Sequence, residues 1–278
     1  MLALLKMELF KLVKRPMTWA LLLLLCGGTG LADLIVLHNL SGAAPDAYAS
    51  TLRSLTLPGI IPNTLGGLSI FAAMMAAILA ASSIGNEYGW GTLRPMLAVG
   101  MPRARFLAAK FLALSCMAVA FVVVPLLIGA LIAVPVALAH HLPVMTETVD
   151  VAWVGALAAM LARTLLTIVV PMTIAFLLGL VGRSQAVGVG AALGWMVGEQ
   201  LLTLLLSTVG QSWARTLDTQ LPGNLGRALL RYNTFGAVAR QAGMISEGRA
   251  AFSLLIYGAV GLAAALVIFR RRDIHGAA

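Results

Sequence analysis

The chain has 278 residues, of which 60% are hydrophobic and only 10% are charged, with a formal net charge of +9. A soluble domain carries about 25% charged residues, so the composition excludes an ordinary soluble protein. In such a hydrophobic chain, the excess of basic residues is interpreted first as a signal of membrane topology, facing anionic headgroups, and not as a sign of nucleic-acid binding. The two cysteines, Cys26 and Cys116, stand far apart in apolar runs and predict neither a disulfide framework nor a metal site.

The chain begins with an amphipathic segment. Placed on a helical wheel, the segment has one apolar arc made of Leu2, Leu5, Leu9, Leu12 and Val13. The opposite arc is charged and holds Glu8, Lys11, Lys14 and Arg15. We expect an N-terminal interfacial helix within residues 1–16 that lies on the inner leaflet with its apolar side down, and Pro16 should mark the bend into the membrane.

Six further stretches are long and apolar enough to span a bilayer. A spanning helix needs about 20 mostly apolar residues, and its backbone must form its hydrogen bonds within the segment. The six stretches are residues 17–38, 64–84, 106–138, 152–181, 187–208 and 251–269. The sequence therefore predicts an all-α membrane protein whose residues 1–278 form a single transmembrane domain with six spans.

The basic residues predict the orientation of these spans, because short cytoplasmic loops are enriched in Lys and Arg. With the N-terminus inside, most Lys and Arg lie in the inner segments, so we expect a multi-pass protein of the cytoplasmic membrane with both termini in the cytoplasm. The outer stretch 209–250 is the exception, since it also carries several arginines. Leu225, Leu229 and Tyr232 recur there at helical spacing, with Asn224 as a possible N-cap. This pattern predicts short outer interfacial helices before the sixth span, which either touch lipid headgroups or roof a transport pathway.

Three ionisable residues lie well inside predicted spans, away from the span ends, where a charge is costly and is a functional hypothesis by default: Asp33, Arg163 and Glu199. Arg163 and Glu199 have similar expected depths, so an ion pair between them is possible, either as a lock between two helices or as part of a polar pathway. The fifth span also carries a stripe of small residues, Gly190, Gly194 and Gly198. Such stripes allow close helix packing, here either within the bundle or between two copies of it. The second span has a similar stripe at Ala73, Ala77 and Ala81.

The motifs of common enzymes are missing from the sequence. A phosphate-binding loop of the form GxxxxGK[ST] needs a Gly-Lys pair, and none of the four lysines follows a glycine. His140 and His141 are adjacent and therefore point in different directions on a helix, which is a poor arrangement for a metal site. We expect no catalytic residue, no metal and no cofactor in this chain.

The loop between the second and third spans presents large apolar side chains at the inner face. Trp90, Leu93 and Leu97 share a face if the loop is helical, and they need a cover, either the membrane or a soluble partner. The loop resembles the first cytoplasmic loop of permease subunits of the type-2 ABC exporter family. Residues that match the family pattern in order are Glu87, Gly91, Thr92, Leu93, Arg94, Pro102, Arg103 and Lys110. The sequence departs from it at Pro95, so we expect the coupling helix of this loop to begin near Arg94.

The resemblance implies a transport subunit that is not itself an enzyme. It implies a separate cytosolic ATP-binding cassette subunit in two copies, which would bind ATP and Mg, and a second permease, the same or a similar chain. Nucleic acid is not expected as a partner; membrane lipid is. The contact with the ATPase subunit would involve Glu87, Tyr88, Trp90, Gly91, Thr92, Leu93, Arg94, Pro102 and Arg103.

The function implied in this way is ATP-driven export of a hydrophobic or amphipathic substrate, namely a drug, an antimicrobial peptide or a lipid. Two other functions remain open on the sequence. One is an ion-coupled secondary transporter that uses Asp33, Arg163 and Glu199. The other is a membrane anchor for another protein, in which the polar residues inside the membrane would be dispensable.

Overall fold

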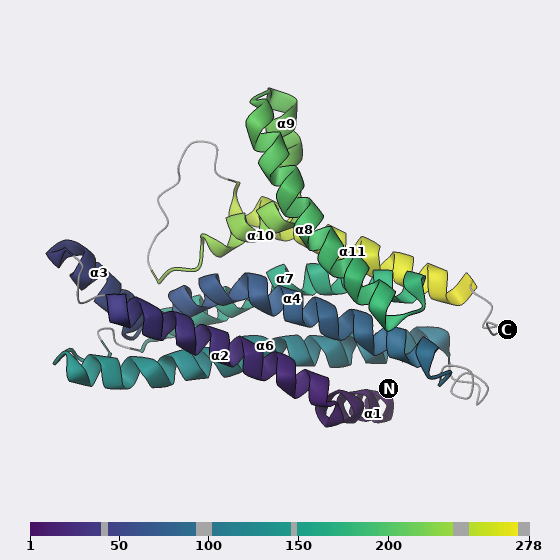
Figure 1. Cartoon of the computed structure of the whole chain (residues 1–278), viewed down its shortest axis with the longest axis horizontal. Coiled ribbons are helices and arrows are strands. Elements are labelled where there is room, and N and C mark those ends of the chain that lie inside the picture. The colour runs from purple at the N-terminus through teal and green to yellow at the C-terminus, as the bar shows by residue number, and fades with distance from the viewer. Residues whose placement is uncertain (40–43, 93–101, 146–148, 236–244, 272–278) are drawn as a thin grey trace.

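The computed structural model describes residues 1–39, 44–92, 102–145, 149–235 and 245–271 (Figure 1). These ranges are helical apart from short connections and contain no strand, only an isolated bridge between Leu57 and Met145. The helices are α1 (Leu2–Lys14), α2 (Pro16–Asn39), α3 (Pro45–Leu55), α4 (Ile60–Gly89), α6 (Arg103–Ala139), α7 (Val151–Gly182), α8 (Gln185–Val209), α9 (Ser212–Asp218), α10 (Pro222–Leu230) and α11 (Glu247–Arg271).

Six of these helices, α2, α4, α6, α7, α8 and α11, are long and apolar enough to cross a membrane. Each contains one of the predicted spans, so the prediction of an all-α membrane protein with six spans is confirmed. Helices α6 and α7 have 37 and 32 residues and contain Pro125, Pro135 and Pro171 without ending there. The predicted coupling helix near Arg94 falls on residues 93–101, which lie outside the described residues.

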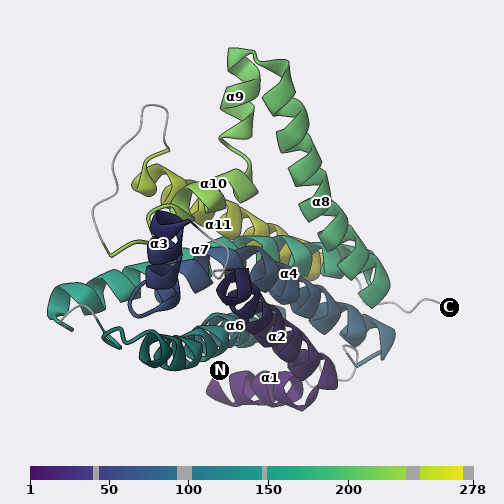
Figure 2. The ribbon, with the colours of Figure 1, turned by 60° about the vertical axis from the view of Figure 1, so that its left-hand side comes forward.

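Helix α4 is the centre of the bundle. In its most apolar window 72% of the residues are buried, against 11% for α2 and for α8. Figure 1 shows α4 and α7 side by side in the middle, with α2 and α6 on one side and α8, α10 and α11 on the other. Helix α8 leaves this core and leans outward toward α9, which is visible in both views (Figure 2). Most of α8 is therefore not covered by the described part of the chain.

Small residues allow α4, α7 and the beginning of α8 to pack closely. A Cβ on Gly85 would lie 2.6 Å from the backbone of Gln185, and a Cβ on Gly188 would lie 2.7 Å from the Cα of Gly179. Both distances are shorter than any real Cβ contact, so only glycine fits. Two residues of the predicted alanine stripe of the second span, Ala77 and Ala81, belong to the same interface, since they cluster with Ala175 of α7 and Ala192 of α8.

The predicted glycine stripe of the fifth span is placed differently. A Cβ on Gly190, Gly194 or Gly198 would meet no atom within 4 Å. Within the described residues no other helix therefore packs against this stripe, and a contact between two copies stays a prediction.

The short helices predicted before the sixth span are α9 and α10. Leu225 and Leu229 of α10 are fully buried, and they pack with Leu254 of α11 and Val170 of α7. Helix α10 thus joins the bundle. Asn224 does not cap it as expected: Leu221 is the N-cap, because Pro222 takes the first helical position.

Candidate functional site

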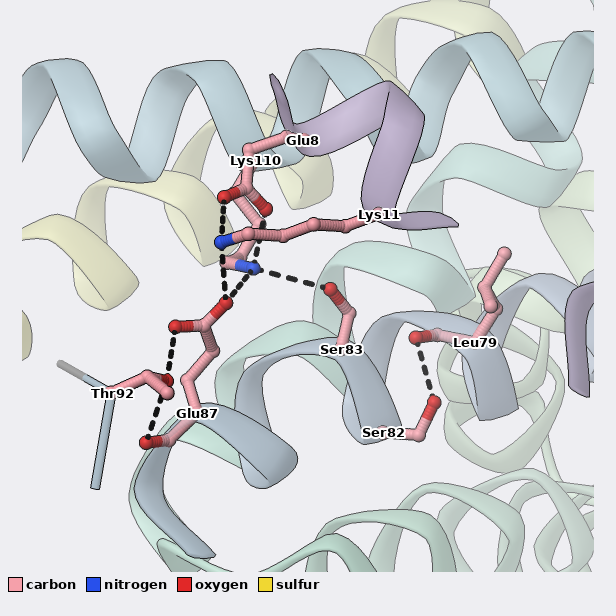
Figure 3. Close-up of polar contacts among 8 residues, drawn as sticks. All are labelled: Glu8, Lys11, Leu79, Ser82, Ser83, Glu87, Thr92 and Lys110. Atoms are coloured by element: carbon pink, nitrogen blue, oxygen red, sulfur yellow. Dashed lines mark hydrogen bonds and ion pairs between the residues drawn. The ribbon is translucent and has the colours of Figure 1, made fainter. Parts of the chain in front are cut away.

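Four charged side chains meet in the interior where α1, the end of α4 and the beginning of α6 come together (Figure 3). This charge cluster consists of Glu8, Lys11, Glu87 and Lys110. Glu8, Glu87 and Lys110 are each no more than 2% exposed, although they are charged residues. Groups of this kind are almost never fully buried unless they are paired, so their pairing defines this region.

Lys110 Nζ lies at the centre of the cluster. It donates hydrogen bonds to Glu8 Oε2 at 2.6 Å and to Glu87 Oε1 at 2.9 Å, and Ser83 Oγ lies 3.4 Å away. Lys11 Nζ donates to Glu8 Oε1 at 2.9 Å and lies 3.4 Å from Glu87 Oε1. Two ammonium groups thus neutralise two carboxylates, and the cluster has no net charge.

Helical spacing brings these groups together. Glu8 and Lys11 are three residues apart on α1, and Ser83 and Glu87 are four apart on α4, so each pair shares a helix face. Lys110 occupies the second turn of α6, and its ammonium lies 5.4 Å from the ring centroid of Phe106 one turn before it. Removing one partner of such a buried pair leaves an uncompensated charge, which costs about 3–5 kcal/mol.

The cluster also reaches the chain that follows α4. Thr92 Oγ1 donates to Glu87 Oε2 at 2.9 Å, and Thr92 is the last described residue before residues 93–101. Gly91 has a φ of +67°, a left-handed conformation that favours glycine and turns the chain away from α4. Glu87 therefore contacts α1 and α6 with one carboxylate oxygen and the start of this loop with the other.

Arg15, in the connection between α1 and α2, lies near the same groups. Burial lowers the pKa of the Arg15 guanidinium, and the carboxylates of Glu87 and Glu8 oppose this shift. The guanidinium lies 5.6 Å from the ring centroid of Trp90, a cation–π distance. The Trp90 side chain itself is 67% exposed. This end of the bundle thus presents an exposed aromatic residue next to Arg15, whose guanidinium is electrostatically attracted to the buried carboxylates.

The remaining residues predicted to contact an ATPase subunit differ in their surroundings. Tyr88 is half-buried, and Pro102 is exposed. Arg103 Nη1 donates to the carbonyl oxygens of Phe269, at 3.3 Å, and of Arg270, at 2.8 Å, and so holds the end of α11. Leu93 and Arg94 lie outside the described residues. Glu87 is buried and faces inward, not toward a partner surface.

The ion pair that the sequence allows between Arg163 and Glu199 is not formed in the structure. Arg163 Nε donates to Glu247 Oε1 at 2.8 Å, and its Nη1 donates to the carbonyl of Tyr232 at 2.9 Å. Glu199 accepts a short hydrogen bond from the backbone N–H of Gly223. The two residues thus bind different elements, because equal depth in the membrane does not make two helix faces meet.

Asp33 stands apart from both of these sites. It is buried on α2, and its Oδ2 has no hydrogen-bond partner among the described residues. Nor do the described residues contain a group of three or more His, Cys, Asp or Glu side chains that could hold a metal ion.

A comparison with protein families gives the chain its identity. The family model described as ABC-2 family transporter protein matches residues 4–209, which is more than half of the 278 residues. The chain belongs to the ABC-2 transporter family. A search of curated proteins finds no match. The matched segment of this ABC-2 protein contains most of α1 and all of α4 and α6, and therefore the whole charge cluster. Its six apolar helices make it a multi-pass membrane protein. Permeases of this family are membrane transport subunits and in general are not catalytic themselves.

Sequence reasoning missed the charge cluster of this ABC-2 protein. The helical wheel put Glu8 on the charged arc, opposite the arc that faces the membrane, whereas Glu8 is buried and paired with Lys110 of α6. One signal could have found the cluster. Lys110 stands in an apolar stretch near the beginning of a span, where an ammonium needs a carboxylate. Glu8 and Glu87 are the carboxylates that the predicted topology brings to that end of the bundle.

Proposed function

We propose that this ABC-2 protein is the permease subunit of an ABC exporter in the cytoplasmic membrane, with both termini in the cytoplasm. ATP hydrolysis in a separate cytosolic ATP-binding subunit, present in two copies, drives it, and ATP and Mg are bound there. A second permease, the same or a similar chain, completes the pathway. The substrate is hydrophobic or amphipathic: a drug, an antimicrobial peptide or a lipid. The membership of the ABC-2 family supports this proposal, because permeases of the family pair in general with an ATP-binding subunit.

The observation that carries the proposal is the charge cluster next to the loop after α4. Thr92 connects this loop to Glu87, and Glu87 binds Lys11 and Lys110. A push on the loop would therefore reach α1 and α6 through short, buried contacts. Packed interiors and buried ion pairs do not deform continuously, so such a push moves the three helices together or exchanges one arrangement for another.

The distribution of charge supports the proposed orientation. The end of the bundle that contains α1 and the charge cluster also contains the exposed residues Lys14, Trp90 and Arg271. Figure 1 shows α1 and the end of α11 at the same end of the long axis. An excess of Lys and Arg is typical of the cytoplasmic side.

The proposal is tested by co-expressing the chain with candidate ATP-binding cassette subunits of the same genome and purifying the complex in nanodiscs. We expect no ATPase activity from the chain alone and activity from the complex. Trp90→Asp should abolish co-purification, because it places a charge on the exposed aromatic surface. Trp213→Asp is the matched control, since Trp213 of α9 is 52% exposed and far from the charge cluster.

Lys110→Met separates binding from coupling. We expect this variant to bind the ATPase subunit and to lose ATP-dependent transport, because Lys110 is buried and offers no partner surface. ATP hydrolysis by the purified chain alone would refute the proposal. Transport that continues without nucleotide under a proton or sodium gradient would favour an ion-coupled transporter instead.

A further inference from the structure

A cavity of about 410 Å³ lies between α4, α7, α8 and α10, away from the charge cluster. Its volume is within the range of small-molecule binding sites, about 300–1,000 Å³. It lies beside the central helix α4, and it is enclosed in part by α10, which packs against α7 and α11.

Most of the cavity wall is apolar. Helix α4 contributes Ile70, α7 contributes Pro171 and Ile174, and α8 contributes Trp195 and Met196. An apolar wall that includes an aromatic ring favours an alkyl chain or another hydrophobic body.

The acidic residue of the cavity already has partners. Glu199 accepts a hydrogen bond from the backbone N–H of Gly223, which is the second residue of α10. The N-terminus of a helix carries a partial positive charge that stabilises a carboxylate. The positive charge of Arg227 also attracts the Glu199 carboxylate. Glu199 is therefore a poorer binding partner for a cationic ligand than a free carboxylate would be.

The two arginines of the cavity have hydrogen-bond donors to spare. Arg227 Nη2 donates to Asn224 Oδ1 at 2.5 Å, but Arg227 Nε is buried and has no hydrogen-bond partner among the described residues. Arg231 lies one turn later on the same side and also lines the cavity. Two guanidinium groups against one carboxylate leave the polar end of the cavity positive. A buried N–H without a hydrogen-bond partner is unfavourable, and an anionic ligand would supply the missing acceptor.

We propose that this cavity binds an anionic amphiphile, with a carboxylate or phosphate headgroup at Arg227 and Arg231 and an apolar chain along Ile70, Ile174 and Trp195. Guanidinium groups recognise both headgroups, because each offers oxygen atoms that accept two parallel hydrogen bonds. Binding itself is independent of the proposed function. Only the further step, that the bound amphiphile is the transported substrate, rests on it.

The test uses the full chain in nanodiscs of zwitterionic phosphatidylcholine, without nucleotide and without an ATPase subunit. Three photoreactive alkyl probes of equal chain length carry a carboxylate, a phosphate monoester or a trimethylammonium headgroup. Mass spectrometry measures cross-linking to peptides of α8 and α10. We expect at least tenfold stronger labelling by the two anionic probes than by the cationic probe, and competition by unlabelled dodecyl phosphate.

Substitutions assign the labelling to the cavity. The double variant Arg227→Gln/Arg231→Gln should lose about tenfold in anionic labelling, whereas Arg215→Gln, at an exposed arginine of α9 outside the cavity, should not change it. Arg227→Glu/Arg231→Glu should reverse the preference in favour of trimethylammonium, which a mere loss of folding would not do. If Arg227 variants do not fold, the single variant Arg231→Gln, at an exposed position, should still lower anionic labelling severalfold.

Several outcomes would overturn the proposal. They are equal labelling by anionic and cationic probes, a preference of the unchanged protein for trimethylammonium, and anionic labelling that the arginine variants leave intact. Competition by inorganic phosphate as strong as that by dodecyl phosphate would mean a site for a free anion and not for an amphiphile. None of these results depends on ATP, so the proposed pairing with an ATPase subunit would stand or fall separately.

Discussion

Replacing Lys110 by methionine removes the central ammonium of the charge cluster and keeps most of the side-chain volume. Glu8 and Glu87 would then share Lys11, whose side chain is 31% exposed. Breaking a buried ion pair by removing one partner costs about 3–5 kcal/mol. Because Lys110 serves two carboxylates at 2.6 and 2.9 Å, we expect a loss of unfolding free energy in this range.

The loss is measured by reversible unfolding in mixed micelles of a mild detergent and dodecyl sulfate, followed by circular dichroism. Lys6→Met is the matched control, because Lys6 is an exposed lysine of α1 and should change the unfolding free energy by no more than about 0.5 kcal/mol. A double-mutant cycle with Glu87→Gln should give a coupling of about 1–3 kcal/mol, so that the double variant is less harmful than the sum of the single variants.

Two results would refute this reasoning. If Lys110→Met is no less stable than Lys6→Met, the buried contacts of Lys110 do not hold α1, α4 and α6 together. If the effects of Lys110→Met and Glu87→Gln add without coupling, the two side chains do not interact in the folded protein.

Three further predictions concern helix packing, a partly exposed ion pair and helix capping. Gly85→Ala should strongly lower thermal stability in detergent, because the added Cβ would overlap the backbone at the beginning of α8. Gly190→Ala, at an open position of α8, should have little effect. Equal effects of the two variants would contradict the packing of α4 against α8. A double-mutant cycle of Arg163 and Glu247 should give a coupling free energy of at most about 1 kcal/mol, because this ion pair is partly exposed. A coupling free energy of about 3 kcal/mol would be inconsistent with that exposure. Arg103→Gln should increase hydrogen exchange at the last turn of α11, because the carbonyl groups there lose their side-chain donor. Unchanged hydrogen exchange would mean that this capping contact is absent in solution.

The spans could be predicted from the sequence because their length and composition follow from the bilayer alone. The rotation of each helix about its axis could not, and the charge cluster depends on it. The helical wheel of α1 assumed that the membrane covers its apolar arc and water its polar arc. The structure packs α1 against α6, so Glu8 turns toward Lys110, and a carboxylate that looks solvated in the sequence becomes buried.

The partner of Arg163 illustrates a second limit. Glu247 precedes the predicted sixth span, which begins at residue 251, so the sequence alone does not indicate it as an intramembrane partner of Arg163. Helix α11 begins at Glu247, and α10 turns the chain back toward α7, which brings Glu247 within 2.8 Å of Arg163 Nε. Depth along a helix follows from counting residues, but lateral neighbours depend on long-range packing that the apolar pattern does not encode.

The burial of the charge cluster has a consequence for how the protein responds to its surroundings. Glu8, Glu87 and Lys110 are closed off from water and Lys11 is only partly exposed, so mobile ions have little access to these ion pairs. Salt in the surrounding medium should therefore weaken the charge cluster less than it weakens exposed contacts such as those of Lys14. The arrangement of the charge cluster would then depend on the displacement of α1, α4 and α6 during transport more than on ionic strength, across a wide range of cellular salt concentrations.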